Sequence, residues 1–272
     1  MKIILIGAGN LATQLAVALQ KKGMTPAYIY SRTRESAEQL SEDSAQRLAG
    51  KLKCGMTTRI EELYNDADIY IFSVSDSALE KLIDKVPRCE EALYLHTAGS
   101  IPMSVFSGKC RRYGVLYPLQ TFSKNRDVQF DEIPVFIEGS SPETTATLQK
   151  IGKEISGQVL EATSEQRRHL HLAAVFACNF TNHLYAIAAE LLEKQHLPFD
   201  ALRPLIRETA AKIESLTPID AQTGPAIRYD RNVMQRHIDL LDDNDEKEIY
   251  RLLSRHIHAF ADTPPTQSTT HE

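Results

Sequence analysis

Short apolar runs alternate with longer amphipathic stretches over the first part of the chain. The apolar runs predict strands buried on both faces of a sheet, because such strands show no alternation of apolar and polar residues. The amphipathic stretches predict helices, and this spacing is typical of a doubly wound, mostly parallel α/β sheet. The predicted strands cover residues 3–6, 27–30, 53–58, 68–74, 92–96, 115–117, 133–137 and 158–160. The predicted helices between them cover residues 10–21, 34–48, 60–65, 77–85 and 142–155.

The pattern changes after Thr163. One long helical period without glycine or proline begins at Ser164, which is the predicted N-cap, and Pro198 follows its end. The later periods are again helical, so the second part of the chain is predicted to be all-helical. These further helices cover residues 199–216, 229–240 and 245–260. We therefore expect an α/β domain at residues 1–163, an all-helical domain at 164–261 and a flexible polar tail at 262–272.

A glycine-rich turn separates the first predicted strand from the first predicted helix. It reads Gly7-Ala8-Gly9-Asn10-Leu11-Ala12, a G-x-G-x-x-A pattern in the strand-turn-helix setting that binds dinucleotides. Gly7 permits the tight turn, Gly9 lets the backbone approach a pyrophosphate, and Ala12 allows close packing of helix on strand. We expect the phosphates to bind the N-terminus of the helix, beside Gly7, Gly9, Asn10 and Leu11. The alternative is a buried strand followed by an incidental turn.

The end of the second predicted strand indicates which dinucleotide binds. NAD-binding domains place an acid there for the ribose 2′-hydroxyl, whereas this chain has Ser31, Arg32, Thr33 and Arg34. Hydroxyl and guanidinium groups suit a 2′-phosphate, so we predict NADP. If Arg32 and Arg34 are only solvated residues at the start of a helix, Ser31 alone leaves the choice open.

The ends of the later strands supply the remaining candidates, because the carboxyl ends of parallel strands line the ligand crevice. Ser73 and Val74 end the fourth predicted strand, and Asp76 is interpreted as a helix cap. His96 and Thr97 end the fifth strand. The sixth strand ends in the segment 117–122, where Gln120 is a candidate substrate ligand.

Composition and charge narrow the possible partners. The 272-residue chain is 42% hydrophobic and 25% charged, with a net charge of −5, which is ordinary for a soluble protein. This balance gives no reason to expect nucleic acid or an anionic membrane as partner. Four scattered cysteines without a C-x-x-C pair predict no metal site and fit a reducing cytoplasm. The uncharged run at residues 3–20 looks superficially like a signal peptide, but strand, turn and helix account for it.

The motifs around residues 7–12, 31–33, 73–76 and 96–100 together resemble the group of pyrroline-5-carboxylate reductase and coenzyme-F420-dependent NADP oxidoreductase, in the 6-phosphogluconate-dehydrogenase-like superfamily. The segments 171–180 and 224–230 resemble the helical domain of unknown function DUF2520. This resemblance implies a Rossmann-like NADP-binding domain at 1–163, oxidoreductase activity, and homodimers formed through the helical domains. Tyr117-Pro118-Leu119-Gln120 also resembles prephenate dehydrogenase loosely, without that enzyme's arginine and histidine pattern.

Three polar residues of the helical part are candidates for chemistry. His171 and Asn179 lie eight residues apart on the long helix, about 12 Å along its axis, and so can border one pocket. We interpret Asn179 as a substrate-orienting donor and His171 or His96 as the proton donor. Alternatively, Asn179 bonds a backbone carbonyl and each histidine is a satisfied structural group. Arg228 is a candidate for binding a substrate carboxylate, or else for pairing with an acid such as Asp230, the predicted N-cap of a helix.

Two functions are compatible with this sequence. The first is an NADP-dependent oxidoreductase that transfers a hydride between NADP(H) and a small carboxylate-bearing carbonyl, hydroxy or imino compound. The second is a non-catalytic NADP-binding sensor or dimeric scaffold, because a shared fold does not by itself define the activity of a site.

Overall fold

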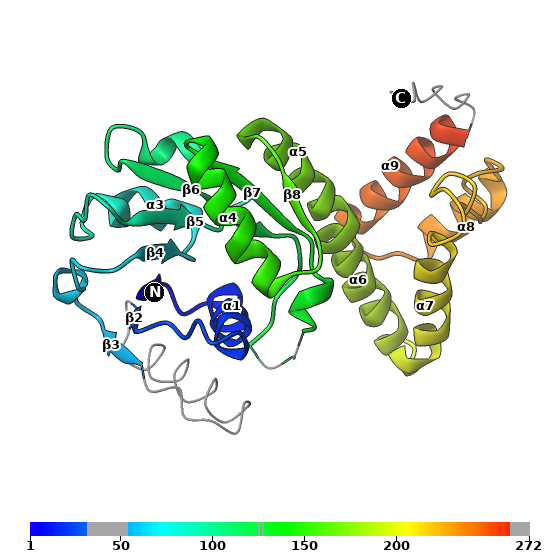
Figure 1. Cartoon of the computed structure of the whole chain (residues 1–272). Coiled ribbons are helices and arrows are strands. Elements are labelled where there is room, and N and C mark those ends of the chain that lie inside the picture. Colours follow the sequence, from blue (N-terminus) through cyan, green and yellow to red (C-terminus); the bar gives the residue numbers. More distant parts are fainter. Residues whose placement is uncertain (32–53, 125, 127, 262–272) are drawn as a thin grey trace, which may run out of the picture. The chain divides into compact units, whose positions relative to one another are not determined.

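The computed structural model describes residues 1–31, 54–124, 126 and 128–261 (Figure 1). The chain divides into two compact units, Met1–Phe180 and Thr181–Glu272. This division falls inside the long helical stretch that begins at Ser164, whereas the sequence places the domain boundary before that stretch. The first turns of the long stretch therefore belong to the same unit as the sheet.

The first unit contains an eight-stranded sheet with the strand order β3-β2-β1-β4-β5-β6-β7-β8. Every neighbouring pair is parallel except β6 and β7, which are antiparallel. The predicted doubly wound, mostly parallel sheet is confirmed. The strands are β1 (Ile3–Ile6), β2 (Tyr28–Tyr30), β3 (Gly55–Thr57), β4 (Ile69–Phe72), β5 (Leu93–His96), β6 (Arg112–Pro118), β7 (Val135–Gly139) and β8 (Val159–Glu161).

Helices and short turns connect these strands. The predicted helix at 34–48 lies outside the described residues. The described α-helices of the sheet region are α1 (Asn10–Lys21), α3 (Asp76–Ile83) and α4 (Pro142–Ile155). Three 3₁₀ turns, η1 (Ile60–Glu62), η2 (Met103–Phe106) and η3 (Phe130–Glu132), lie among them.

Both faces of the sheet are buried, which explains the uninterrupted apolar runs. Ile3 and Leu5 of β1 belong to one core cluster together with residues of α1 and α4. Ile4 and Ile6 belong to the other cluster, together with residues of α3. Successive residues of a strand point to opposite faces, so each residue of β1 needs an apolar side chain. From β1 the strands are added in one direction to β3, and from β4 they are added in the opposite direction. The boundary between β1 and β4 is therefore the kind of switch point where ligands bind in such folds.

The long helical stretch is continuous but not uniform. It consists of α5 (Ser164–Ala174), a π-helical turn η4 (Val175–Phe180) and α6 (Thr181–Glu193). In the second unit, η5 (Phe199–Leu202), α7 (Arg203–Lys212), α8 (Arg231–Asp239) and α9 (Asn244–Ala261) follow α6. Within the part of the chain that the structure describes, no strand occurs after β8.

The N-caps of α5 and α8 were both predicted from the sequence. Thr163, and not Ser164, is the N-cap of α5, and it forms a capping box with Gln166. The predicted cap is therefore wrong by one residue, because the hydroxyl of Ser164 bonds to Glu138 instead. Asp230 is confirmed as the N-cap of α8, where its carboxylate accepts a hydrogen bond from the Val233 amide.

By length and composition alone, the described stretch Ser164–Glu193 qualifies as a membrane span. The sequence pattern predicts a continuous helix here and was not interpreted as a membrane span. Core helices of soluble proteins and signal sequences satisfy the same criterion. The beginning of the stretch is tied to the sheet by polar contacts.

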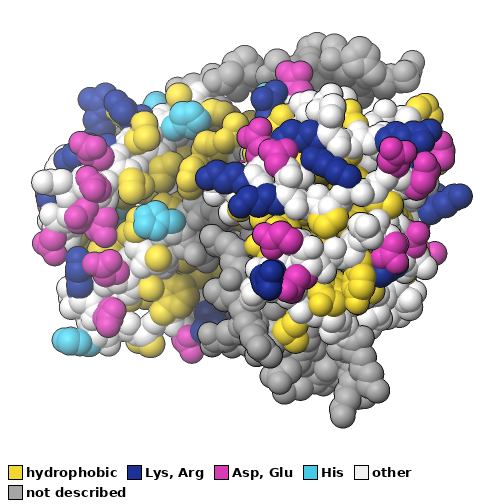
Figure 2. Space-filling model, turned by 90° about the vertical axis from the view of Figure 1, so that its left-hand side faces the viewer, with side chains coloured by type: hydrophobic (Ala, Val, Ile, Leu, Met, Phe, Trp, Pro, Cys, Tyr) yellow, Lys and Arg dark blue, Asp and Glu magenta, His cyan; other side chains and the backbone are white. Residues whose placement is uncertain are grey.

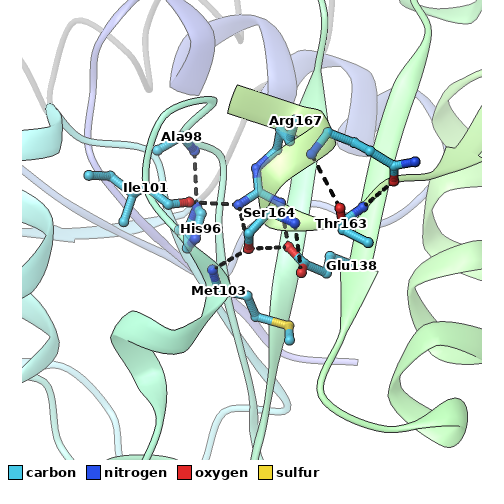
Figure 3. Close-up of polar contacts among 9 residues, drawn as sticks. His96, Ala98, Ile101, Met103, Glu138, Thr163, Ser164 and Arg167 are labelled. Atoms are coloured by element: carbon cyan, nitrogen blue, oxygen red, sulfur yellow. Dashed lines mark hydrogen bonds and ion pairs between the residues drawn. The ribbon is translucent and has the colours of Figure 1, made fainter. Parts of the chain in front are cut away.

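A buried ion pair ties α5 to the sheet (Figure 3). The side chain of Arg167 is only 1% exposed, and its Nη1 donates to Glu138 Oε2 of β7 over 2.5 Å. Its Nη2 donates to the Ile101 carbonyl at 2.6 Å. Glu138 also accepts from the amide and hydroxyl of Ser164, and that hydroxyl accepts from the Met103 amide. The start of α5 is thereby fixed to β7 and to the loop after β5.

We predict that Glu138→Gln destabilises the protein by about 3 kcal/mol, because the buried guanidinium of Arg167 loses its counter-charge. Urea unfolding measures the change. The control is Glu91→Gln, which removes a highly exposed pair with Arg111 and should leave stability near that of the wild type. Equal effects of the two substitutions would contradict a structural role for the buried pair.

Candidate functional site

A cavity of about 980 Å³ lies in the first unit at the carboxyl ends of the central strands. The residues that border it come from the ends of β2 and β6, from the turns after β1, β2, β4, β5 and β6, and from α1, α3 and α5. Of the residues predicted from the sequence, Gly7, Gly9, Asn10, Leu11, Ser31, Ser73, Val74, Thr97, Gln120 and His171 border this cavity. Arg32 and Thr33 lie outside the described residues.

The glycine-rich turn has the geometry expected for binding phosphate. Gly7 has a φ of +125°, and a Cβ there would lie 2.0 Å from the Ser73 carbonyl oxygen, so no other residue fits. Gly9 is the N-cap residue of α1, and a Cβ on it would meet nothing within 4 Å. Open space therefore lies above the helix N-terminus, where free amides and the helix dipole favour an anion. The first turn of α1 contains no acidic residue.

The end of β2 fits the same ligand class. Ser31 is buried and borders the cavity, and it stands where NAD-binding domains place an acid. The two central turns are firmly positioned, because the Gly7 amide donates to the Tyr30 carbonyl and the Ser73 amide donates to the Ile6 carbonyl, each at 2.8 Å. The described residues therefore fit a dinucleotide whose pyrophosphate lies at α1.

Asp76 does not cap its helix as predicted. Ser75 occupies the N-cap position of α3 and makes no side-chain cap bond. The carboxylate of Asp76 instead accepts a hydrogen bond from the Ser100 hydroxyl. It also borders the cavity, so the turn after β4 is linked to the loop after β5 at the rim of the site.

His96 has no exposed surface and does not border the cavity. Its Nδ1 accepts a hydrogen bond from the Ala98 amide at 3.2 Å, and its ring stacks on Phe106. Burial, reinforced by the positive charge of Arg167, lowers the pKa of His96 to about 3. A neutral, enclosed imidazole cannot reach a substrate, so the geometry does not support the expected proton-donor role. His96 instead positions the loop that carries Thr97 and Ala98.

We predict that His96 makes the protein less stable as pH falls. Its pKa is about 3 in the folded protein and near its ordinary value of 6.5 in the unfolded chain. Between these values the unfolded chain binds more protons, so stability falls with decreasing pH, by up to about 1.4 kcal/mol per pH unit. His96→Asn retains an acceptor for the Ala98 amide but cannot titrate. Its unfolding free energy should therefore decline less steeply between pH 6.5 and pH 4.

The control for this experiment is His169→Asn, which changes an exposed histidine of α5. Denaturant unfolding at several pH values should give this variant the same slope as the wild type. A His96→Asn profile parallel to that of the wild type would contradict the neutral, buried state of His96.

His171 borders the cavity together with a residue that the sequence analysis did not select. Tyr117 of β6 has its hydroxyl 3.1 Å from His171 Nδ1, and the two rings lie edge to face at 74°. Burial raises the pKa of Tyr117, while the charge of Arg167 opposes this shift. Tyr117 ends a predicted strand and belongs to the strand-end segment 117–122, from which only Gln120 was selected as a candidate.

Gly99 is a second residue whose role the sequence did not reveal. A Cβ at this position would lie 2.7 Å from both Cγ and Nδ1 of His171. Only glycine lets the loop after β5 pass so close to the imidazole. The signal was present in the segment Ala98-Gly99-Ser100 at the end of a strand, but the clashing neighbour comes from a distant helix.

The loop after β6 adds polar groups to the cavity. Gln120 is exposed and its Oε1 accepts from the Thr121 amide at 2.8 Å. Lys124 is the only lysine or arginine among the described residues that border the cavity. The buried amide of Gln14 in α1 holds this loop by donating to the carbonyls of Ser123 and Arg126 at 2.7 and 3.0 Å.

The other two candidates are not among the residues that border this cavity. Asn179 lies in the π-helical turn, is exposed and is not among the bordering residues. It follows His171 by two helical turns, which carries it past the residues that line the cavity. Arg228 is an exposed residue of the second unit, which the structure describes by itself. Within the described ranges, no three histidine, cysteine, aspartate or glutamate side chains gather as metal ligands.

Figure 2 shows one face of the molecule, on which lysine and arginine side chains are interspersed with aspartate and glutamate. No broad patch of one charge is visible among the described residues of that face.

Solved structures with a similar fold cover nearly the whole chain. A Bacteroides fragilis protein provisionally assigned as an NADP oxidoreductase is 54% identical, covers 95% of this chain and 98% of its own, and superposes with a TM-score of 0.88. This chain belongs to the same family. An imine reductase from Myxococcus stipitatus, solved with NADP⁺, shares the fold at 16% identity and a TM-score of 0.62, over 95% of this chain and 92% of its own.

Family models match both parts of the chain. Residues 1–94 match the model of shikimate/quinate 5-dehydrogenase, and residues 133–257 match the domain of unknown function DUF2520. The predicted resemblance to DUF2520 is confirmed, but the match begins in the sheet region and includes β7, α4 and β8. A glutamyl-tRNA reductase from Pyrobaculum islandicum is 28% identical over 107 residues, which are 39% of this chain and only 25% of that protein.

Proposed function

We propose that this protein is an NADP-dependent oxidoreductase acting on a small carboxylate-bearing carbonyl, hydroxy or imino compound. The observation that carries the proposal is one cavity with a phosphate-binding turn on one side and the polar pair of Tyr117 and His171 on the other. A site that only stored a dinucleotide would need the turn but not a polar group positioned at the strand ends.

Several features support NADP as the cofactor. Gly7 permits the tight turn, Gly9 leaves space for a pyrophosphate, and Ser31 stands where an acid would repel a 2′-phosphate. The relative from Bacteroides fragilis is assigned to NADP, and the imine reductase with the same fold was solved with NADP⁺. When bound, NADPH supplies a hydride, which carries two electrons. Arg32 remains the sequence-based candidate for binding the 2′-phosphate.

The residues of the cavity suggest how substrate is bound. Val74 and Thr97, at the ends of β4 and β5, border the part of the cavity expected to take the nicotinamide. Lys124 offers a positive charge on the same cavity, which suits a substrate carboxylate. Gln120 offers its amide NH₂ group as a donor. Arg228 and Asn179 stay sequence-based hypotheses for binding and orienting the substrate.

We predict that the purified protein oxidises NADPH in the presence of glyoxylate, pyruvate or 1-pyrroline-2-carboxylate, and does so at least about tenfold faster than with NADH. Cofactor absorbance measures the rate. Acetone, which has a carbonyl but no carboxylate, is the control for the role of the acid group and should react poorly.

The non-catalytic alternative makes the opposite prediction. A sensor or scaffold would bind NADPH tightly and turn over none of these compounds, and Asn179→Ala would leave both properties unchanged. That combination of results would argue against an enzyme.

We also propose that a second copy of this chain covers the exposed apolar face of the long helical stretch. Leu172, Phe176 and Phe180 recur at four-residue spacing there and are 55%, 62% and 51% exposed. Such a face is unusual on a monomer and typical of a subunit interface. This proposal agrees with the dimer that the sequence resemblance implies.

We predict that Phe176→Asp converts the dimer to monomer in sedimentation experiments, because a carboxylate cannot be buried unpaired in an apolar interface. The control is Leu160→Asp, at an exposed apolar position of β8, which should leave the sedimentation of the protein unchanged. Monomeric wild-type protein, or recovery of the wild type with the membrane fraction, would contradict this proposal.

A further inference from the structure

The pair formed by Tyr117 and His171 joins two elements that are far apart in the sequence. Tyr117 is the residue before the last in β6, and His171 lies in α5, one helical turn after Arg167. The two side chains meet at the cavity with 3.1 Å between the phenol oxygen and Nδ1. Three features make this contact possible. Arg167 anchors α5, Gly99 has no side chain to obstruct His171, and Tyr117 lies near the carboxyl end of β6, at the edge of the sheet that borders the cavity.

The hydrogen-bonding capacity of the two groups gives the contact a direction. A phenol has one proton to donate and lone pairs to accept. If His171 Nδ1 carries a proton, it donates to the phenol oxygen, and the proton of Tyr117 is then free for a molecule in the cavity. Tyr117 is only 8% exposed yet borders the cavity, so its remaining accessible surface faces that space.

A neighbouring hydroxyl is less suited to the same task. Thr97 also borders the cavity, but its hydroxyl donates to the Phe72 carbonyl of β4 at 3.4 Å. Its proton is already committed to the backbone. Tyr117 has a side-chain partner that can itself give and regain a proton.

We propose that Tyr117 is the catalytic residue that gives the proton to the substrate's carbonyl oxygen or imine nitrogen, and that His171 resupplies it. This inference rests on the proposed function. In the reducing direction the hydride of NADPH bonds to the substrate carbon, and the π electrons of the C=O or C=N bond move to the oxygen or nitrogen. That atom takes the proton of the Tyr117 hydroxyl. The phenolate then takes the Nδ1 proton of the His171 imidazolium, and the neutral imidazole regains a proton from water.

The first test removes the phenol oxygen. Tyr117→Phe should lower kcat with the fastest compound among glyoxylate, pyruvate and 1-pyrroline-2-carboxylate by about 100-fold, the usual effect of losing a general acid. Affinity for NADP⁺, measured by fluorescence titration, should stay unchanged. Tyr113→Phe is the matched control, because Tyr113 lies on the same strand and does not border the cavity. It should retain the kcat of the wild type.

The second test concerns His171, which acts through Tyr117 and is therefore a positioning residue in this scheme. His171→Ala should lower kcat about tenfold or more, with a smaller effect on KM. Added imidazole should restore part of the lost kcat, because it can enter the vacated space and reprotonate Tyr117. Imidazole should not restore the activity of Tyr117→Phe or change that of His169→Ala. A purely structural role for His171 would give no rescue by imidazole.

The outcomes separate this inference from the proposed function. If the wild type reduces a compound of the panel and Tyr117→Phe keeps its kcat, the proton-donor role is overturned while the oxidoreductase stands. If Tyr117→Phe loses NADP⁺ affinity as well, its lower kcat no longer tests proton donation by itself. The rescue of His171→Ala by imidazole then tests the proton transfer from His171 to Tyr117, and absence of rescue overturns it. If the wild type reduces none of the compounds, the proposed function fails and the relay fails with it.

Discussion

The buried pair of Arg167 and Glu138 is the interaction on which the geometry of the site depends. It joins the first turn of α5 to β7, and through the Ile101 carbonyl it also holds the loop after β5. His171 lies one turn further along the same helix, where it meets Tyr117. Without these contacts at the start of α5, the direction of the helix would not be fixed, and His171 would not be held against the end of β6. A buried charge with its counter-charge is costly to disturb, so this contact also specifies the orientation of the helix.

Burial shifts the pKa values of His96 and Tyr117 in opposite directions, and both shifts favour the uncharged form of the side chain. It lowers the pKa of His96 and raises that of Tyr117. The charge of Arg167 lowers both values, because it disfavours an imidazolium and favours a phenolate. His96 is therefore a neutral, enclosed residue that positions the loop after β5, whereas Tyr117 keeps its proton and borders the cavity. The two groups thus differ because His96 is enclosed whereas Tyr117 borders open space.

Much of the first unit could be predicted from local patterns. The strands, the glycine-rich turn and the residues at the strand ends follow from apolar runs and from short-range motifs, since a strand buried on both faces requires an apolar residue at nearly every position. The prediction was wrong where a side chain had a choice of partners. Ser164 bonds Glu138 rather than capping α5, and Asp76 accepts from Ser100 rather than capping α3. Both alternatives come from residues that are distant in the sequence.

The sequence by itself determined the sheet, the position of the phosphate-binding turn and the helical character of the second part, because each depends on neighbours within one element. Tertiary structure alone decided which polar residues meet. It paired Tyr117 with His171, made Gly99 necessary and enclosed His96, because these relations join strands and helices whose separation along the chain carries no signal of contact. Periodicity records which face of an element is buried, but not which side chain on another element lies opposite it.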